Sequence, residues 1–187
     1  SVRINLGLFQ SDINVIWDLA AHDVAILQYL VPEPVYSVVA TGISHTANQV
    51  ENIAYLTLYY QSNKIAHVTV SWTSPVKIRK ILIGGTKRML MYDDLEPTEK
   101  VRIYDTGYCI NSDEAKNKIL VDYRIGDVMI PKVETAEALK GVAADFIKAM
   151  IQGTEPVSNA KTGLSVVSIL EAADKSLKNR GKEVVIV

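Results

Sequence analysis

The sequence has little of what several classes of protein depend on. A single cysteine, Cys109, among 187 residues excludes an internal disulfide framework and suits a reducing cytoplasm. The longest apolar runs are far shorter than the ~20 residues of a membrane-spanning helix. The 20 basic and 21 acidic residues give a net charge of −1, whereas nucleic-acid and anionic-membrane surfaces need clustered positive charge. We therefore expect a cytoplasmic protein that binds neither nucleic acid nor membrane.

Loops that bind phosphates or dinucleotides are also missing. The 10 glycines never occur at the spacing of G-x-G-x-x-G or of a P-loop. The chain is otherwise ordinary, because a 48% hydrophobic content and this length suit one domain with a substantial core. We find no internal repeat, low-complexity segment or linker, so a single domain over residues 1–187 is expected.

The order of the hydrophobic patterns predicts an α+β fold. A helix over 13–30 is stopped by Pro32 and Pro34, and two further helices are expected over 135–151 and 164–179. Strand-like runs joined by short turns fill most of the chain between the first helix and the second. This pattern is typical of an open, mostly antiparallel sheet with helices on one face. The expected strands are 2–6, 35–41, 52–60, 64–73, 77–83, 88–92, 101–104, 119–123 and 184–187.

The hairpin formed by 52–60 and 64–73 has two unlike faces. Alternation places Ala66, Val68, Val70 and Trp72 on one face and leaves His67, with hydroxyl and aromatic neighbours, on the other. We expect helices to bury the aliphatic face, and water or a partner subunit to cover the other.

Within 13–30, Asp18 and His22 are four residues apart, so a helix places them one turn apart on the same face. Such a pair can act in acid–base chemistry, because a carboxylate orients an imidazole that titrates near neutral pH. The alternatives are a capping aspartate with a structural histidine, or two ligands of a metal site. The remaining histidines, His45 and His67, have no ligand spacing of their own.

Asp23 projects among the apolar positions of the same helix. A buried carboxylate must be paired or hydrogen-bonded to be tolerated. We expect Asp23 either to be held by backbone donors or to mark the point where the helix no longer packs entirely in the hydrophobic core.

Arg124 and Lys132 flank an irregular segment that contains Gly126 and Pro131. Segments of this kind often line binding sites, and these charges suit a carboxylate or a phosphate group. The alternative is a pair of solvated charges at a sheet edge.

Several short motifs follow one another along the chain. Residues 17–23 read WDLAAHD and precede an aliphatic helix that ends in Tyr29 and Leu30. The later motifs are VSW at 70–72, IGGT at 83–86, YDD at 92–94, YRIGD at 123–127, PK at 131–132, EAL at 137–139, TGL at 162–164 and LEAA at 170–173. In this order the motifs resemble the Gfo/Idh/MocA family of sugar oxidoreductases, and specifically its second domain. The stretch RIGDVMIPK most resembles the branch that oxidises C3 of UDP-N-acetylglucosamine or its uronic acid.

The resemblance implies a two-domain enzyme that uses NAD or NADP. A Rossmann domain with a dinucleotide loop and a Glu-Lys-Pro lysine comes first, and the domain seen here supplies the wall of the substrate site. His22 corresponds to the proton acceptor and Asp18 to its orienting partner, while metal ligands are not expected. The substrate-binding candidates are Asn14, Trp17, Arg124 and Lys132.

The resemblance also implies a homodimer or homotetramer that forms through the open sheet face. The Rossmann motif and Glu-Lys-Pro are absent from this sequence, so we expect residues 1–187 to be one C-terminal substrate-binding and oligomerisation domain, inactive alone. Two other functions stay open: a non-catalytic ligand-binding or oligomerisation module, and a metal-dependent hydrolase that uses Asp18 and His22.

Overall fold

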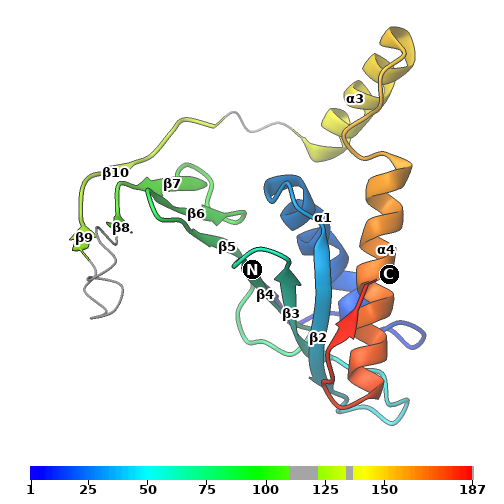
Figure 1. Cartoon of the computed structure of the whole chain (residues 1–187). Helices are drawn as coiled ribbons and strands as arrows, with labels where there is room; N and C mark the ends of the chain where they lie inside the picture. The colour runs from blue at the N-terminus through cyan, green and yellow to red at the C-terminus, as the bar shows by residue number, and fades with distance from the viewer. Residues whose placement is uncertain (110–121, 134–136, 187) are drawn as a thin grey trace. The chain divides into compact units, whose positions relative to one another are not determined.

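The computed structural model describes residues 1–109, 122–133 and 137–186, and it divides into two compact units (Figure 1). The first unit contains Ser1–Ile78 and Ala136–Val187, and the second contains Arg79–Thr135.

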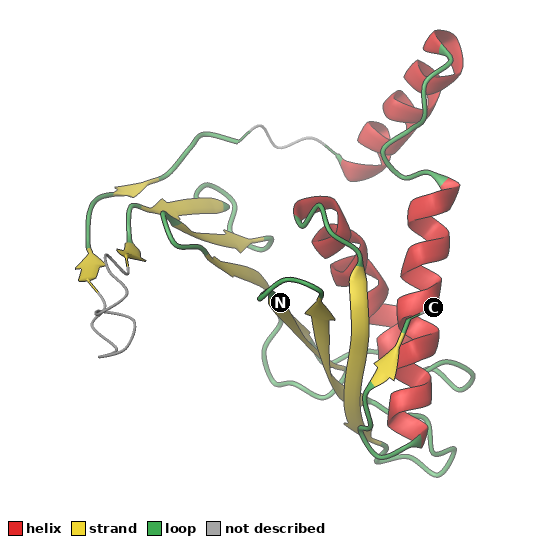
Figure 2. Cartoon of the chain, in the orientation of Figure 1, coloured by secondary structure: helices red, strands yellow, loops and turns green. Residues whose placement is uncertain are grey.

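The first unit is a sheet with η1, α1 and α4 on one face (Figure 2). Its strand order is β1-β4-β3-β2-β11, in which only the β1–β4 pair is parallel. The strands are β1 (Val2–Ile4), β2 (Val35–Ile43), β3 (Ile53–Tyr60), β4 (Ile65–Ser71) and β11 (Val184–Val185). The helices are the π-helical turn η1 (Ile16–Ala20), α1 (Ala21–Leu30), α3 (Ala138–Gln152) and α4 (Ala160–Lys178). The predicted α+β class and the mostly antiparallel sheet are therefore confirmed.

The core lies between the sheet and the helices η1, α1 and α4. Leu56 faces Val68 across β3 and β4, and Leu58 faces Val38 across β3 and β2. These four side chains are buried together with Val24, Ile169 and Ala173 from the helices. Full burial of such a side chain stabilises the fold by about 1.5–3 kcal/mol. The expected aliphatic face of the hairpin is thus the buried one.

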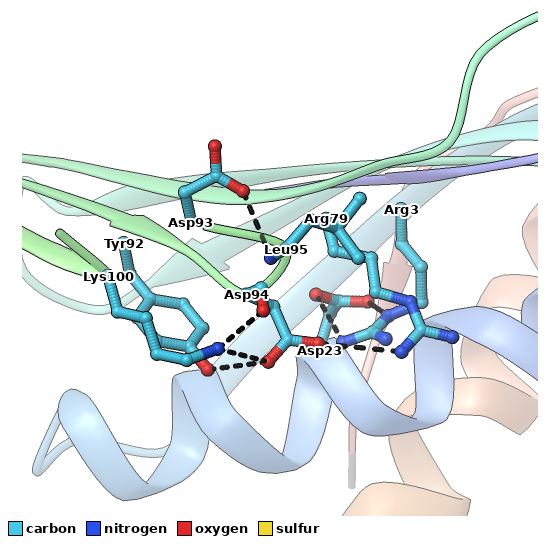
Figure 3. A network of polar contacts seen from close by, with 8 residues as sticks. All are labelled: Arg3, Asp23, Arg79, Tyr92, Asp93, Asp94, Leu95 and Lys100. Carbon is cyan, nitrogen blue, oxygen red and sulfur yellow. Dashed lines mark hydrogen bonds and ion pairs between the residues drawn. The ribbon is translucent and has the colours of Figure 1, made fainter. Parts of the chain in front are cut away.

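The second unit is built from short antiparallel strands in the order β5-β6-β7-β10, with a separate β8–β9 pair. The strands are β5 (Ile78–Gly84), β6 (Met89–Asp93), β7 (Val101–Tyr104), β8 (Gly107–Cys109), β9 (Asp122–Arg124) and β10 (Val128–Met129). Asp94 accepts a hydrogen bond from the Tyr92 hydroxyl at 2.9 Å and pairs with Arg79 at 3.4 Å (Figure 3). Burial raises the pKa of Asp94, but these contacts and Lys100 outweigh it and lower the pKa.

Several boundaries differ from the sequence-based prediction. Helix α4 begins at Ala160 rather than at 164, because Asn159 caps it by accepting a hydrogen bond from the Thr162 amide at 3.0 Å. Strand β8 was not expected at all. Residues 119–121 of one expected strand and 135–136 of one expected helix lie outside the described residues.

A carboxylate in the loop after α1 holds the hairpin turn. Glu33 accepts hydrogen bonds from the Lys64 ammonium group at 2.7 Å and from the amide and hydroxyl of Ser62 at 2.7 Å each. The hydrogen bond from Lys64, followed by those from Ser62, lowers the pKa of Glu33 to about 2. The loop after α1 is thereby tied to the turn between β3 and β4.

Asp23 is paired by the side chain of Arg3 in β1 (Figure 3) and by that of Ser1, which precedes β1, rather than by backbone donors. Its side chain is only 2% exposed and accepts hydrogen bonds from Arg3 Nε at 2.5 Å and from the Ser1 hydroxyl at 2.5 Å. The expectation that this carboxylate needs a partner is met, and the partner anchors α1 to the sheet.

Replacing Asp23 with alanine is expected to lower the free energy of unfolding by about 3 kcal/mol, because Arg3 would lose its partner in a nearly buried position. The measurement is denaturant unfolding followed by circular dichroism. Glu171→Ala, at an exposed position of α4, is the control and should change stability by less than about 0.5 kcal/mol. Equal stability of the two variants would contradict an anchoring role for Asp23.

Candidate functional site

The candidate site is the helix formed by η1 and α1, which lies on the sheet of the first unit. The Asn14 side chain begins it by accepting hydrogen bonds from the amides of Ile16 at 3.1 Å and Trp17 at 3.3 Å. The first turn is π-helical, and the Ala21 amide donates to the carbonyl of Ile16. Single π-helical turns of this kind are rare and are frequently found at functional sites.

Asp18 and His22 both lie on this helix, as the four-residue spacing predicts. Asp18 sits in the π-helical turn, partly exposed, and its Oδ2 accepts a hydrogen bond from Trp72 Nε1 at 2.8 Å. His22 follows in α1 with an exposed side chain. The pair therefore combines a held carboxylate with an imidazole that a bound molecule can reach.

A cavity of about 680 Å³ lies between α1 and α4, and neither Asp18 nor His22 lines it. Ala25 and Tyr29, which continue the stripe of Asp18 and His22, lie in its wall, opposite Lys161 and Thr162 of α4. Val24 and Leu27 of the same helix are buried in the core.

Asn14 and Trp17 share a partner that the sequence analysis missed. Asp174 of α4 accepts hydrogen bonds from Asn14 Nδ2 and from Trp17 Nε1, each at 2.8 Å. All three residues, with Glu51, line a small cavity of about 230 Å³. The polar atoms of Asn14 and Trp17 therefore tie the start of the helix to α4, and a role in binding substrate stays a prediction.

The other two predicted binding residues belong to the second unit. Arg124 pairs with Asp105 at 2.9 Å and donates a hydrogen bond to the carbonyl of Lys87. Lys132 is exposed. A binding role for either residue remains a prediction.

Two further properties bear on the class of site. Over residues 1–109, 122–133 and 137–186, no group of three or more His, Cys, Asp or Glu side chains is placed to hold a metal ion. None of the helices in this part of the chain has the length and apolar character that crossing a bilayer requires. The cytoplasmic location remains a prediction.

Comparison with known proteins agrees with the motifs. Residues 10–91 match the family model described as the GFO/IDH/MocA C-terminal domain, and this range includes η1, α1 and the central hairpin. The resemblance that the sequence motifs carry is therefore confirmed: residues 10–91 match the GFO/IDH/MocA C-terminal domain, and solved oxidoreductases share the fold. No curated protein matches it.

Solved structures share the fold at low sequence identity. UDP-N-acetylglucosamine 3-dehydrogenase from Acidithiobacillus ferrooxidans is 19% identical with a TM-score of 0.74, over 96% of this chain and 52% of that one. A putative NADPH-dependent oxidoreductase from Desulfitobacterium hafniense is 19% identical with a TM-score of 0.72, over 99% and 55%. Levoglucosan dehydrogenase, in complex with NADH and L-sorbose, is 14% identical with a TM-score of 0.72, over 100% and 57%. The chain thus spans about half the length of these proteins.

Replacing Asp174 with alanine is expected to lower the free energy of unfolding by about 1–3 kcal/mol, because Asn14 and Trp17 would lose their shared acceptor. The measurement is denaturant unfolding followed by tryptophan fluorescence. Lys175→Ala, at the exposed neighbouring position, is the control and should be nearly neutral. A neutral Asp174→Ala variant would mean that the two hydrogen bonds do not hold the helix.

Proposed function

We propose that this chain is the substrate-binding half of an NAD(P)-dependent oxidoreductase, which oxidises a hydroxyl group of a sugar or a nucleotide-activated sugar. The observation that carries the proposal is the exposed His22 four residues after the held carboxylate of Asp18, on a helix that begins with a π-helical turn. The family match and the names of the similar structures support the reaction class.

The residue types suit this chemistry. Oxidation of an alcohol removes a hydride from carbon and a proton from oxygen, so the site needs a base close to the hydroxyl group. A neutral imidazole can accept that proton near neutral pH, and a nearby carboxylate stabilises the resulting imidazolium. His22 is the proposed proton acceptor and Asp18 the residue that orients it and balances its charge.

A nicotinamide cofactor would accept the hydride. This chain's part in holding it is limited, because the 10 glycines form no dinucleotide loop and the sheet of the first unit is built mainly from antiparallel hairpins. The residues here would form the wall that faces the reacting carbon, and a preceding Rossmann domain would bind the dinucleotide.

Helix α3 supports the proposed partner domain. Its apolar side chains recur every three or four residues and stay exposed: Leu139 is 76% exposed, Val142 60%, Phe146 58% and Met150 70%. A helical stripe of this kind is normally buried against another element. Coverage of only about half of each similar structure agrees with a second half that could bury it.

The open face of the sheet supports the proposed homodimer or homotetramer. Tyr55 is 54% exposed, Tyr59 38% and Ile65 53%, and Tyr59 faces Ile65 across β3 and β4. Neighbouring apolar side chains on an uncovered sheet are typical of a surface that packs against another subunit.

In the full-length protein, Tyr55→Arg combined with Ile65→Arg is expected to convert the oligomer into a monomer, because the added charges would be buried in the interface. Sedimentation velocity measures the change. Tyr123→Arg, at a position that is 80% exposed in the second unit, is the control and should leave the oligomer intact. An oligomer that survives the double substitution would rule out this face as the interface.

In the full-length protein, His22→Ala is expected to lower kcat about 100-fold or more, because the proton acceptor is lost. The melting temperature should stay unchanged, since the His22 side chain is exposed. The measurement is the formation of reduced nicotinamide with a panel of UDP-sugars and free sugars, each offered with NAD and with NADP.

His45→Ala is the matched control and should retain turnover, because His45 hydrogen-bonds Asn52 in a loop outside the proposed machinery. Near-normal turnover by His22→Ala would contradict its role. A full-length protein with no turnover on any substrate would instead favour the non-catalytic ligand-binding module.

A further inference from the structure

We infer that Trp72 is a positioning residue that holds the Asp18 carboxylate for the reaction, an inference that rests on the proposed function. Its indole Nε1 donates a hydrogen bond to Asp18 Oδ2 at 2.8 Å. Trp72 comes immediately after β4 and is 1% exposed, whereas Asp18 belongs to the π-helical turn. The bond therefore joins the sheet to the one turn that carries the proposed catalytic carboxylate.

The position of the Trp72 ring is set by several contacts. The Trp72 amide donates to the carbonyl of Asn52 at 2.9 Å, and its carbonyl accepts from the Gly7 amide at 3.0 Å. Phe9 packs on the indole with ring centroids 5.7 Å apart. A side chain at Gly7 would crowd the ring, since its Cβ would lie 3.1 Å from Trp72 Cδ1. The indole N–H is thus a fixed donor rather than a mobile one.

The chemistry of the indole suits this role. It is a donor only, so it orients a carboxylate without competing for the proton that His22 is to receive. A hydrogen bond to an ionised carboxylate is also stronger than one between neutral groups. Because Trp72 holds Oδ2, the other oxygen of Asp18 is the one left to meet His22 or the substrate.

The second tryptophan shows the same chemistry in a different place. Trp17 Nε1 donates to Asp174 at 2.8 Å and connects the π-helical turn to α4, while Trp72 connects it to the end of β4. Trp17 and Asp18 are consecutive, so the two bonds hold adjacent residues against different elements. Together they restrict rotation of the turn about the helix axis, which sets the direction of Asp18.

The test is Trp72→Phe in the full-length protein, compared with Phe9→Leu. Trp72→Phe keeps an aromatic ring and removes the donor, whereas Phe9→Leu weakens the packing on the same ring and keeps the donor. We expect Trp72→Phe to lower kcat about 10- to 100-fold with little change in KM, because the carboxylate is misplaced rather than removed. Phe9→Leu should keep most of kcat, because the backbone hydrogen bonds of Trp72 to Asn52 and Gly7 still hold the residue and its donor in place. Equal losses in the two variants would show a purely structural role and overturn the inference.

A second measurement does not depend on turnover. The indole N–H signals are recorded by NMR on the full-length protein and assigned with Trp72→Phe and Trp17→Phe. Asp18→Asn is expected to shift the Trp72 signal and leave the Trp17 signal in place, and Asp174→Asn should do the reverse. A Trp72 signal unmoved by Asp18→Asn would show that the bond is absent and overturn the inference.

The outcomes separate this inference from the proposed function. Loss of turnover in His22→Ala with normal turnover in Trp72→Phe would reject the role of Trp72 and keep the function. Absence of turnover in the unmodified full-length protein would reject both the function and the catalytic role of Trp72. The indole signals would then decide only whether the bond exists.

Discussion

Directional hydrogen bonds to three carboxylates determine how the first helix lies on the sheet. Apolar burial holds the helix there, but the hydrophobic effect has no direction and tolerates rotation about the helix axis. Asp23 is held by Arg3 from β1, Asp18 by Trp72 at the end of β4, and Trp17 by Asp174 on α4. Each bond joins the helix to a different element, so together they leave His22 on the exposed side.

The proposed chemistry depends on this arrangement. A proton acceptor must be accessible and its carboxylate partner must point in a set direction, and these two requirements favour opposite degrees of burial. The helix meets both, because the exposed His22 follows a carboxylate whose one oxygen is held by a buried indole. The open sheet face and the apolar stripe of α3 are then available for the proposed second subunit and partner domain.

Much of the fold could be predicted because a helix or strand that is buried on one face carries apolar residues at a characteristic spacing in the sequence. Alternation over 52–60 and 64–73 predicted the β3–β4 hairpin and its buried face, and the four-residue spacing placed Asp18 and His22 on one helix. The start of α4 was missed because it depends on the single cap Asn159 rather than on periodicity. The π-helical turn was missed for a related reason, since one widened turn barely alters the apolar pattern.

The sequence by itself determined the fold class, the family resemblance and the need for a partner at Asp23, because each follows from local spacing and residue type. Only the tertiary structure decided which partners meet. Asp174 lies 160 residues from Asn14, and Trp72 lies 54 residues from Asp18. Periodicity tells which face of an element a side chain occupies, but the residue opposite that side chain depends on how distant elements pack. This packing supplies the partners that hold Asp18 and its neighbours in the candidate site.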